Sequence, residues 1–230
     1  MSLYKKIHSD WKKLDYQYFW GDPMDSRFFV LNKIPKNHHN KILDIGCSVG
    51  VVLRNTVGKN KIGIDIDFNS LKIGKQNFPE IEFISASANF LPFIENSFDF
   101  ILSIYTLDEY EIDQNVAIGE IERTLSDKGE IFLTGNWYKL KHKRGTSTPE
   151  KIHGLWATKL SKNFSFTIRG YTRPKMVGIK AKIEKLILMK SPNFIFNLLR
   201  PDLKLYNSYI ENLEPVELEP YIISGNKINV

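Results

Sequence analysis

Residues 41–50 read KILDIGCSVG, a short apolar run that ends at an acid and passes into a segment with two glycines. This pattern predicts a buried β-strand over residues 41–45 and a tight turn over residues 46–50 that leads into a helix. Glycines let the backbone come close to a ligand, and the free N–H groups at the start of a helix can face it. The stretch alone indicates a ligand site only weakly, because many structural turns carry two glycines.

Further strands and helices follow this turn in alternation. The alternation is typical of βαβ units with right-handed crossovers and a parallel sheet. We therefore expect an α/β fold of three layers, Rossmann-like and mostly parallel, with ligands bound beyond the carboxyl ends of the strands. Strands are predicted at residues 61–66, 81–84, 100–104 and 130–134, and helices at residues 67–76 (with Asp67 or Asn69 as N-cap) and 113–125.

The chain divides into three predicted parts. Residues 1–35 are expected to form an N-terminal helical arm over the ligand site, and residues 138–200 a basic helical lid inserted into the core. The core itself comprises residues 36–137 and 201–230, and its C-terminal part is expected to contain a helix at 202–214 and an antiparallel hairpin turning at 224–226.

Length and composition fit one such domain with an addition, since 42% of the 230 residues are apolar. The single cysteine excludes an intramolecular disulfide and a cysteine-rich zinc site, which favours a reducing cytoplasm. The first residues carry no apolar segment of the kind found in a secretory signal, and every apolar run is far shorter than the roughly 20 residues of a membrane span. We expect a cytoplasmic protein, with peripheral membrane contact as an open alternative.

Five motifs occur in order along residues 40–135, namely DIGCSVG at 44–50, GIDID at 63–67, SANFLPF at 87–93, SFD at 97–99 and RTLSDKG at 123–129. Their order and spacing resemble the class I S-adenosylmethionine-dependent methyltransferases. The resemblance implies S-adenosylmethionine as the cofactor, S-adenosylhomocysteine as the product, and no metal. It does not extend over most of the last 95 residues.

The resemblance also implies which residues contact the cofactor. Asp44 and the backbone of the turn would hold its methionine part, with Ser103 beside the amino-acid end, and Asp65 would hold the ribose. Ile66 would pack on the adenine face, and Ser87 and Ala88 would meet the adenine edge. The full expected set is Asp44, Gly46, Cys47, Ser48, Gly50, Asp65, Ile66, Ser87, Ala88 and Ser103.

Two positions depart from the family pattern. Ser48 stands where the family has the middle glycine of the turn, which costs little at an ordinary φ angle and crowds the ligand otherwise. Ser87 stands where the family usually offers an acid to the adenine amino group, which weakens adenine recognition by roughly 1–3 kcal/mol.

Two other interpretations of the turn remain open. Asp44 and Asp65 could be structural carboxylates near helix N-termini. A nicotinamide enzyme would also place an acid at the end of the second strand. Against it, Val52 replaces the third glycine of that fingerprint, and no second nucleotide-binding half follows.

Candidate catalytic residues follow the strand at 100–104. Tyr105, Asp108 and Glu109 lie where a general base or an acceptor-orienting group would be needed. The two acids could equally be favourable first-turn residues of the next helix. Trp20 in the N-terminal arm and His153 in the insertion are candidate substrate-binding residues, and packing or plain surface exposure is the alternative for each.

Positive charge is concentrated in one segment. Residues 139–190 hold 14 Lys and Arg against 2 Asp and Glu, whereas residues 1–138 hold 15 against 19. A solvated lid helix, a basic amphipathic helix on an anionic membrane, or a contact with phosphates of RNA or a small molecule would each explain this segment. Nucleic acid is the weaker choice, since no RNA-binding module is visible.

The sequence thus predicts a methyltransferase that acts on a small-molecule or lipid acceptor of anionic or lipid-like chemistry. The alternative is a non-catalytic S-adenosylmethionine-binding protein or a subunit that depends on a partner chain.

Overall fold

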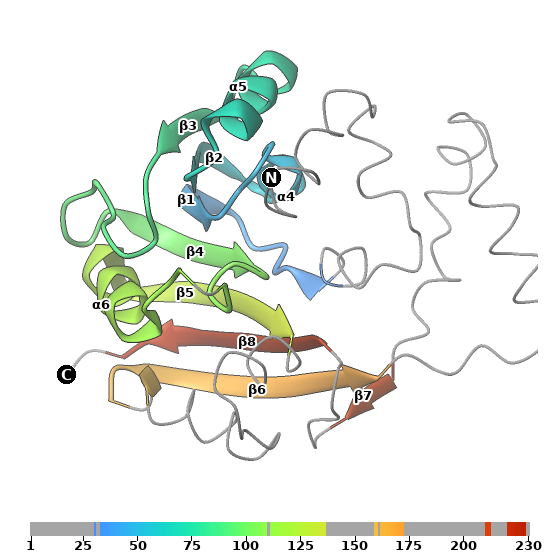
Figure 1. Cartoon of the computed structure of the whole chain (residues 1–230). Helices are drawn as coiled ribbons and strands as arrows, with labels where there is room; N and C mark the ends of the chain where they lie inside the picture. The colour runs from blue at the N-terminus through green and yellow to red at the C-terminus, as the bar shows by residue number, and fades with distance from the viewer. Residues whose placement is uncertain are drawn as a thin grey trace, which may run out of the picture. The chain divides into compact units, whose positions relative to one another are not determined.

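The structure is a computed structural model that describes residues 30, 33–109, 111–136, 159–160, 162–172, 210–212 and 220–228 (Figure 1). In chain order its elements are β1 (His39–Ile45), α4 (Val51–Arg54), β2 (Gly58–Asp65), α5 (Phe68–Asn77), β3 (Glu82–Ser85), β4 (Phe98–Ile104), α6 (Gln114–Thr124), β5 (Leu125–Asn136), β6 (Phe164–Thr172), β7 (Ile210–Asn212) and β8 (Pro220–Lys227).

One sheet of eight strands organises these elements, in the order β3-β2-β1-β4-β5-β8-β6-β7. Strands β1 to β5 pair in parallel, and β8 pairs antiparallel to both β5 and β6. From β1 the chain first goes outward to β2 and β3, and then crosses to β4 on the other side of β1. Ligands in such sheets bind where the strand order reverses, beyond the carboxyl ends of β1 and β4.

Side chains cap the two longer helices at their N-termini. The carboxylate of Asp67 accepts a hydrogen bond from Asn69 N (3.1 Å) and one from Ser70 Oγ (2.7 Å), which confirms Asp67 as the N-cap of α5. Asp113 does the same for α6, accepting from Asn115 N at 2.8 Å. The bonds from Asn69 N and Asn115 N satisfy helix N–H groups that have no partner within the helix.

Helices cover both faces of the sheet. On one face, Ala117, Ile118 and Ile121 of α6 pack into the hydrophobic core with side chains of β1, β4 and β5, such as Leu43 and Ile101. On the other face Gly63 leaves room for Leu53 of α4, since an added Cβ would lie 3.0 Å from its Cδ1 atom. Gly74 of α5 likewise lies against the ring of Phe83. The predicted three-layer, mostly parallel α/β fold is therefore confirmed.

Strand β8 confirms the predicted antiparallel pairing in the C-terminal part and corrects the predicted position of its turn. Ser224 and Gly225 lie inside β8, where Ser224 pairs with Phe132 and Thr167 on the two neighbouring strands. The Ser-Gly-Asn composition suggested a turn, but ladder pairing on both sides holds this segment extended. The predicted helix at residues 202–214 is also wrong at Ile210–Asn212, which form β7.

Strand β6 corrects the predicted helical insertion. Residues 164–172 lie within the segment expected to form a basic lid, yet they pair with β8 over seven residues. Their sequence, FSFTIRGYT, alternates apolar and polar residues over much of its length, which is the period of a half-buried strand. The remainder of the insertion lies mostly outside the described residues.

Residues 34–172 and 211–230 form one compact unit, which contains nearly all of the described residues. Residues 1–33 and 173–210 form the second unit, in which only residues 30, 33 and 210 are described. Among the described helices, none is long and apolar enough to cross a membrane.

Candidate functional site

The turn at residues 46–50 lies at the carboxyl end of β1 and is tied to the end of β2. Gly46 N and Cys47 N both donate to Ile64 O, at 2.8 and 2.9 Å. Gly46 and Gly50 have φ angles of 77° and 81°, in the left-handed region that favours glycine. The turn is therefore a defined backbone structure that needs both glycines.

Ser48 adopts the unusual conformation that the sequence left open. Its φ angle is 51°, which is uncommon for a residue with a Cβ atom. Its N–H donates to Asp65 Oδ2 at 2.8 Å, and its buried hydroxyl finds no hydrogen-bond partner in the part of the chain that the structure describes. The serine in place of glycine thus adds backbone strain and a buried polar atom at the same point.

Asp44 is a buried carboxylate without a hydrogen-bond donor among the described residues. It is 1% exposed, and neither carboxylate oxygen accepts a hydrogen bond from any described residue. Burial, and second the nearby charge of Asp65, raise the pKa of Asp44 well above its usual range. Buried polar groups are normally satisfied, so this carboxylate is a candidate for contact with a ligand group.

Asp65, at the end of β2, faces the same turn. Its Oδ1 accepts from Asp67 N at 2.9 Å and its Oδ2 from Ser48 N at 2.8 Å. These bonds fix the half-buried carboxylate at the edge of the turn. The next side chain, Ile66, is 65% exposed and presents an apolar surface beside it.

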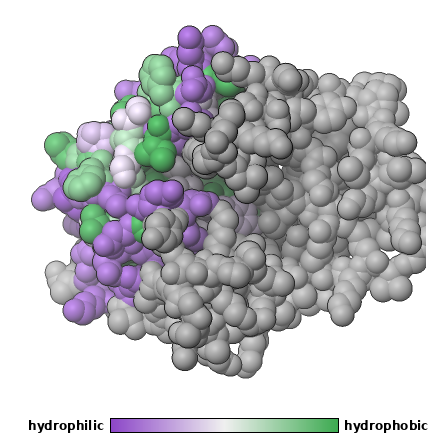
Figure 2. Space-filling view, in the orientation of Figure 1, coloured by the Kyte–Doolittle hydropathy of each residue, from purple (hydrophilic) through white to green (hydrophobic). Residues whose placement is uncertain are grey.

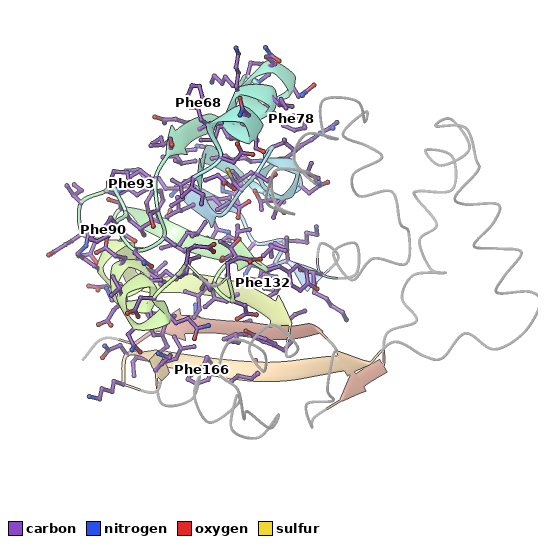
Figure 3. All side chains as sticks on the ribbon, in the orientation of Figure 1. Phe68, Phe78, Phe90, Phe93, Phe132 and Phe166 are labelled. Atoms are coloured by element: carbon purple, nitrogen blue, oxygen red, sulfur yellow. The ribbon has the colours of Figure 1, made fainter. Side chains whose placement is uncertain are left out.

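The loop between β3 and β4 carries Ser87 and Ala88. Ala88 is buried, and Ser87 Oγ accepts from Asn89 N at 3.2 Å, which closes a short turn. In Figure 3, Phe90 and Phe93 lie on this loop beside α6. Phe93 packs edge-on against Phe98, with ring centroids 4.8 Å apart, whereas Phe90 is exposed.

Two residues of α6 clamp this loop. Arg123 donates to Phe93 O at 2.6 Å and to Leu91 O at 3.1 Å, while Glu120 accepts from Leu91 N at 2.7 Å. Arg123 also pairs with Glu120 at 2.8 Å, and its hydrogen bond lowers the pKa of the Glu120 carboxyl. The SANFLPF and RTLSDKG motifs therefore meet in space, a link that sequence reasoning missed although both motifs were identified.

Hydrophobic and hydrophilic side chains are interspersed on the surface of the described part. Figure 2 shows hydrophobic side chains, in green, at the surface among hydrophilic ones in purple. The exposed apolar residues include Ile66 and Phe68 near the end of β2, and Phe90 and Ile94 on the β3–β4 loop.

The segment after β4 contacts the turn directly. A Cβ atom added to Gly46 would lie 2.0 Å from Thr106 Oγ1, so the Thr106 side chain occupies the space above this glycine. Tyr105 has a φ angle of 60°, and its N–H donates to Thr134 O of β5 at 3.1 Å. Ser103 lies just before, fully buried, with its hydroxyl donating to Ile45 O at 3.0 Å.

Asp108 is buried in a polar cluster. Its Oδ1 accepts from the hydroxyl of Tyr221 on β8 at 2.8 Å and from Gln114 Nε2 on α6 at 3.4 Å. Gly135 makes room for this cluster, because a Cβ there would lie 2.0 Å from Asp108 Oδ2 and 2.2 Å from Tyr221 Oη. Glu109 is half-buried, and its N–H donates to Thr106 O.

The described residues thus bring together the turn, Asp44, Asp65 and Ile66, and place Tyr105, Asp108 and Glu109 after the neighbouring strand β4. Sequence reasoning did not single out Thr106, Gln114, Glu120 or Tyr221. Trp20 and His153 lie outside the described residues. Within the described ranges, no group of three or more His, Cys, Asp or Glu side chains is placed to hold a metal ion.

Residues 43–133 match the family model of the methyltransferase domain. The matched segment contains the turn at residues 46–50, the β3–β4 loop and the segment after β4. The fold is similar to that of solved S-adenosylmethionine-dependent methyltransferases. A structure of such an enzyme from Thermotoga maritima superimposes with a TM-score of 0.62 at 14% identity, covering 98% of this chain and all of the other.

Two curated proteins are similar over part of the chain. An uncharacterised protein of Methanocaldococcus jannaschii is 36% identical over 102 residues, which cover 44% of this chain and 39% of that protein. A demethylmenaquinone methyltransferase of Paenarthrobacter aurescens is 36% identical over 109 residues, covering 46% and 43% respectively. The chain therefore matches less than half the length of each of these relatives.

Proposed function

We propose that the chain binds S-adenosylmethionine at the turn of residues 44–50 and transfers its methyl group to a small-molecule acceptor. The observation that carries this proposal is the buried carboxylate of Asp44, which has no partner among the described residues. It lies beside two glycines with left-handed φ angles, inside a segment that matches the methyltransferase domain. The α-ammonium group of the cofactor is the positive partner that this carboxylate lacks.

The residues around the turn fit the rest of this cofactor. In the proposal, the N–H groups of the turn hold the methionine part, and Cys47 and Ser103 form its buried floor. Asp65 accepts the ribose hydroxyls, and Ile66 packs on the adenine face. Ser87 and Ala88 lie at the adenine edge.

Positioning accounts for much of the proposed catalysis. Bound S-adenosylmethionine supplies a methyl group on a positively charged sulfur, so an acceptor held in line needs little further activation. Tyr105, Asp108 and Glu109 would orient the acceptor, and Glu109 is the carboxylate best exposed to take a proton from it. Asp108, tied to Tyr221, would hold this segment in place.

For the acceptor we propose a lipid-like molecule. The similar demethylmenaquinone methyltransferase acts, by its name, on a quinone lipid precursor. The basic segment of residues 139–190 would suit contact with an anionic membrane surface that supplies such an acceptor, with Trp20 and His153 on the acceptor side.

Calorimetry with S-adenosylhomocysteine tests the donor half of this proposal, and product release over a panel of quinols, sterols and small amines tests the acceptor half. We expect binding in the micromolar range and turnover with at least one apolar acceptor. Absence of binding would contradict the proposal. Binding without turnover on any acceptor would favour the alternative, a non-catalytic binding protein or a subunit that needs a partner chain.

A further inference from the structure

We propose that Asp44 gives up a proton to solvent when the cofactor binds, so that the carboxylate and the ligand ammonium form an ion pair only in the complex. This inference rests on the proposed function, because it needs a ligand with a cationic amino-acid end. It concerns the coupling between protonation and binding, beyond the identity of the ligand.

Among the described residues, the geometry around Asp44 offers no group that could stabilise its charge in the free protein. Asp44 is the penultimate residue of β1, where it pairs with Gly63 of β2 and Leu102 of β4. Neither neighbour carries a polar side chain, and the following helix begins with three buried apolar residues at 51–53. Both oxygens are fully buried and lack a hydrogen-bond donor among the described residues.

Two other acids of the described part, in contrast, accept hydrogen bonds from backbone N–H groups. Asp99 Oδ2 accepts from Asn40 N and Lys41 N at 3.1 and 3.0 Å, and Asp113 accepts from the first N–H groups of α6. The missing donors at Asp44 are therefore a property of this position.

The nearby charge of Asp65 from β2 acts against the ionisation of Asp44. The thiol of Cys47 from the turn is the second titratable group there, and its pKa is itself raised by burial and then by Asp44 and Asp65. No lysine, arginine or histidine of the described residues is among the influences on the pKa of Asp44. Burial without a positive partner favours the protonated acid in the free protein.

A ligand ammonium reverses this balance. The positive charge next to the carboxyl favours its ionised form, so the O–H proton leaves to solvent while the ammonium keeps its own protons. One proton released per ligand bound makes the affinity rise with pH by up to about tenfold per pH unit, as long as Asp44 is protonated in the free protein and the ligand amino group keeps its charge.

Calorimetry in two buffers measures this proton directly. S-Adenosylhomocysteine is titrated into the whole chain at about pH 6, where its amino group is fully protonated. Cacodylate and Bis-Tris serve as buffers because their ionisation enthalpies differ strongly. We expect an apparent binding enthalpy that depends on the buffer and corresponds to release of up to one proton.

The control ligand is 5′-methylthioadenosine, which shares the nucleoside and lacks the ammonium. It should bind without a buffer-dependent enthalpy. The variant Asp44→Asn should bind S-adenosylhomocysteine more weakly and also without buffer dependence. Should this variant fail to fold, the two ligands on the natural chain still decide the question.

The outcomes separate this inference from the proposed function. Binding of S-adenosylhomocysteine with the same enthalpy in both buffers overturns the proton release and leaves the proposed function standing. Equal proton release with both ligands also overturns it, since the proton would then come from another group. If neither ligand binds, the proposed function and the inference are contradicted together.

Discussion

Two buried aspartates, Asp44 at the end of β1 and Asp108 after β4, differ in how their carboxylates are satisfied. Asp44 has no hydrogen-bond donor among the described residues, whereas Asp108 accepts from Tyr221 and Gln114. A carboxylate that the fold itself satisfies stabilises the structure, while one that the fold leaves unsatisfied costs free energy until a ligand supplies its partner. The difference supports the proposal that Asp44 meets a ligand, while Asp108 holds the segment after β4 in place.

The largest effect is expected from filling the space beside Asp108. Gly135→Ala places a methyl group 2.0 Å from a carboxylate oxygen and 2.2 Å from the Tyr221 hydroxyl. We expect a loss of about 3 kcal/mol in the free energy of unfolding, at the upper end for overpacked cores, as measured by urea denaturation. Gly119→Ala is the matched control, since no atom lies within 4 Å of its added Cβ on α6, and it should stabilise by about 0.5–1 kcal/mol. Equal effects of the two variants would contradict the packing described here.

Removing one donor to Asp108 should cost somewhat less. Tyr221→Phe deletes the hydroxyl that donates to Asp108 at 2.8 Å and keeps the buried ring. A hydrogen bond to a charged group contributes about 1.5–3 kcal/mol, so we expect a loss of about 2 kcal/mol in denaturation experiments. An unchanged unfolding midpoint would show that the Tyr221–Asp108 bond does not hold the segment after β4.

Asp44→Asn should stabilise the free protein, whereas Gly135→Ala and Tyr221→Phe destabilise it. The folded-state pKa of Asp44 is raised by burial and by Asp65, so its contribution to stability is fully present below the unfolded pKa and is lost as pH rises through the folded one. Asparagine cannot ionise, so the variant should gain stability relative to the natural chain as pH rises above the usual range of an aspartate pKa. A natural chain that becomes more stable than the variant above this range would contradict the raised pKa.

The smallest effect is expected at Ser48. Its φ angle of 51° is unfavourable for a residue with a Cβ atom, and its buried hydroxyl has no hydrogen-bond partner among the described residues. Ser48→Gly removes both penalties and adds backbone freedom to the unfolded chain, which leaves a gain of about 0.5 kcal/mol. A loss of stability would mean that the serine contributes a contact that outweighs its strain.

Local patterns predicted the parallel half of the sheet because each strand there is a buried apolar run followed by turn residues. The turn at residues 46–50 and Asp65, which accepts a hydrogen bond from it, were predictable for the same reason. Strand β6 was missed because the positive charge of residues 139–190 outweighed the two-residue alternation of 164–172 in the interpretation. The Asp108–Tyr221 bond joins residues 113 positions apart, and only the pairing of β8 with β5 brings them together. The φ angle of Ser48 likewise depends on the closed turn and could not be read from residue types.

A structure of the chain with bound S-adenosylhomocysteine tests the central claim most directly. We predict the ligand's amino nitrogen within about 2.7–3.2 Å of an Asp44 carboxylate oxygen, with the bond between Tyr221 and Asp108 unchanged. A ligand bound elsewhere, with Asp44 still buried and without a partner, would contradict the assignment of this turn as the donor site.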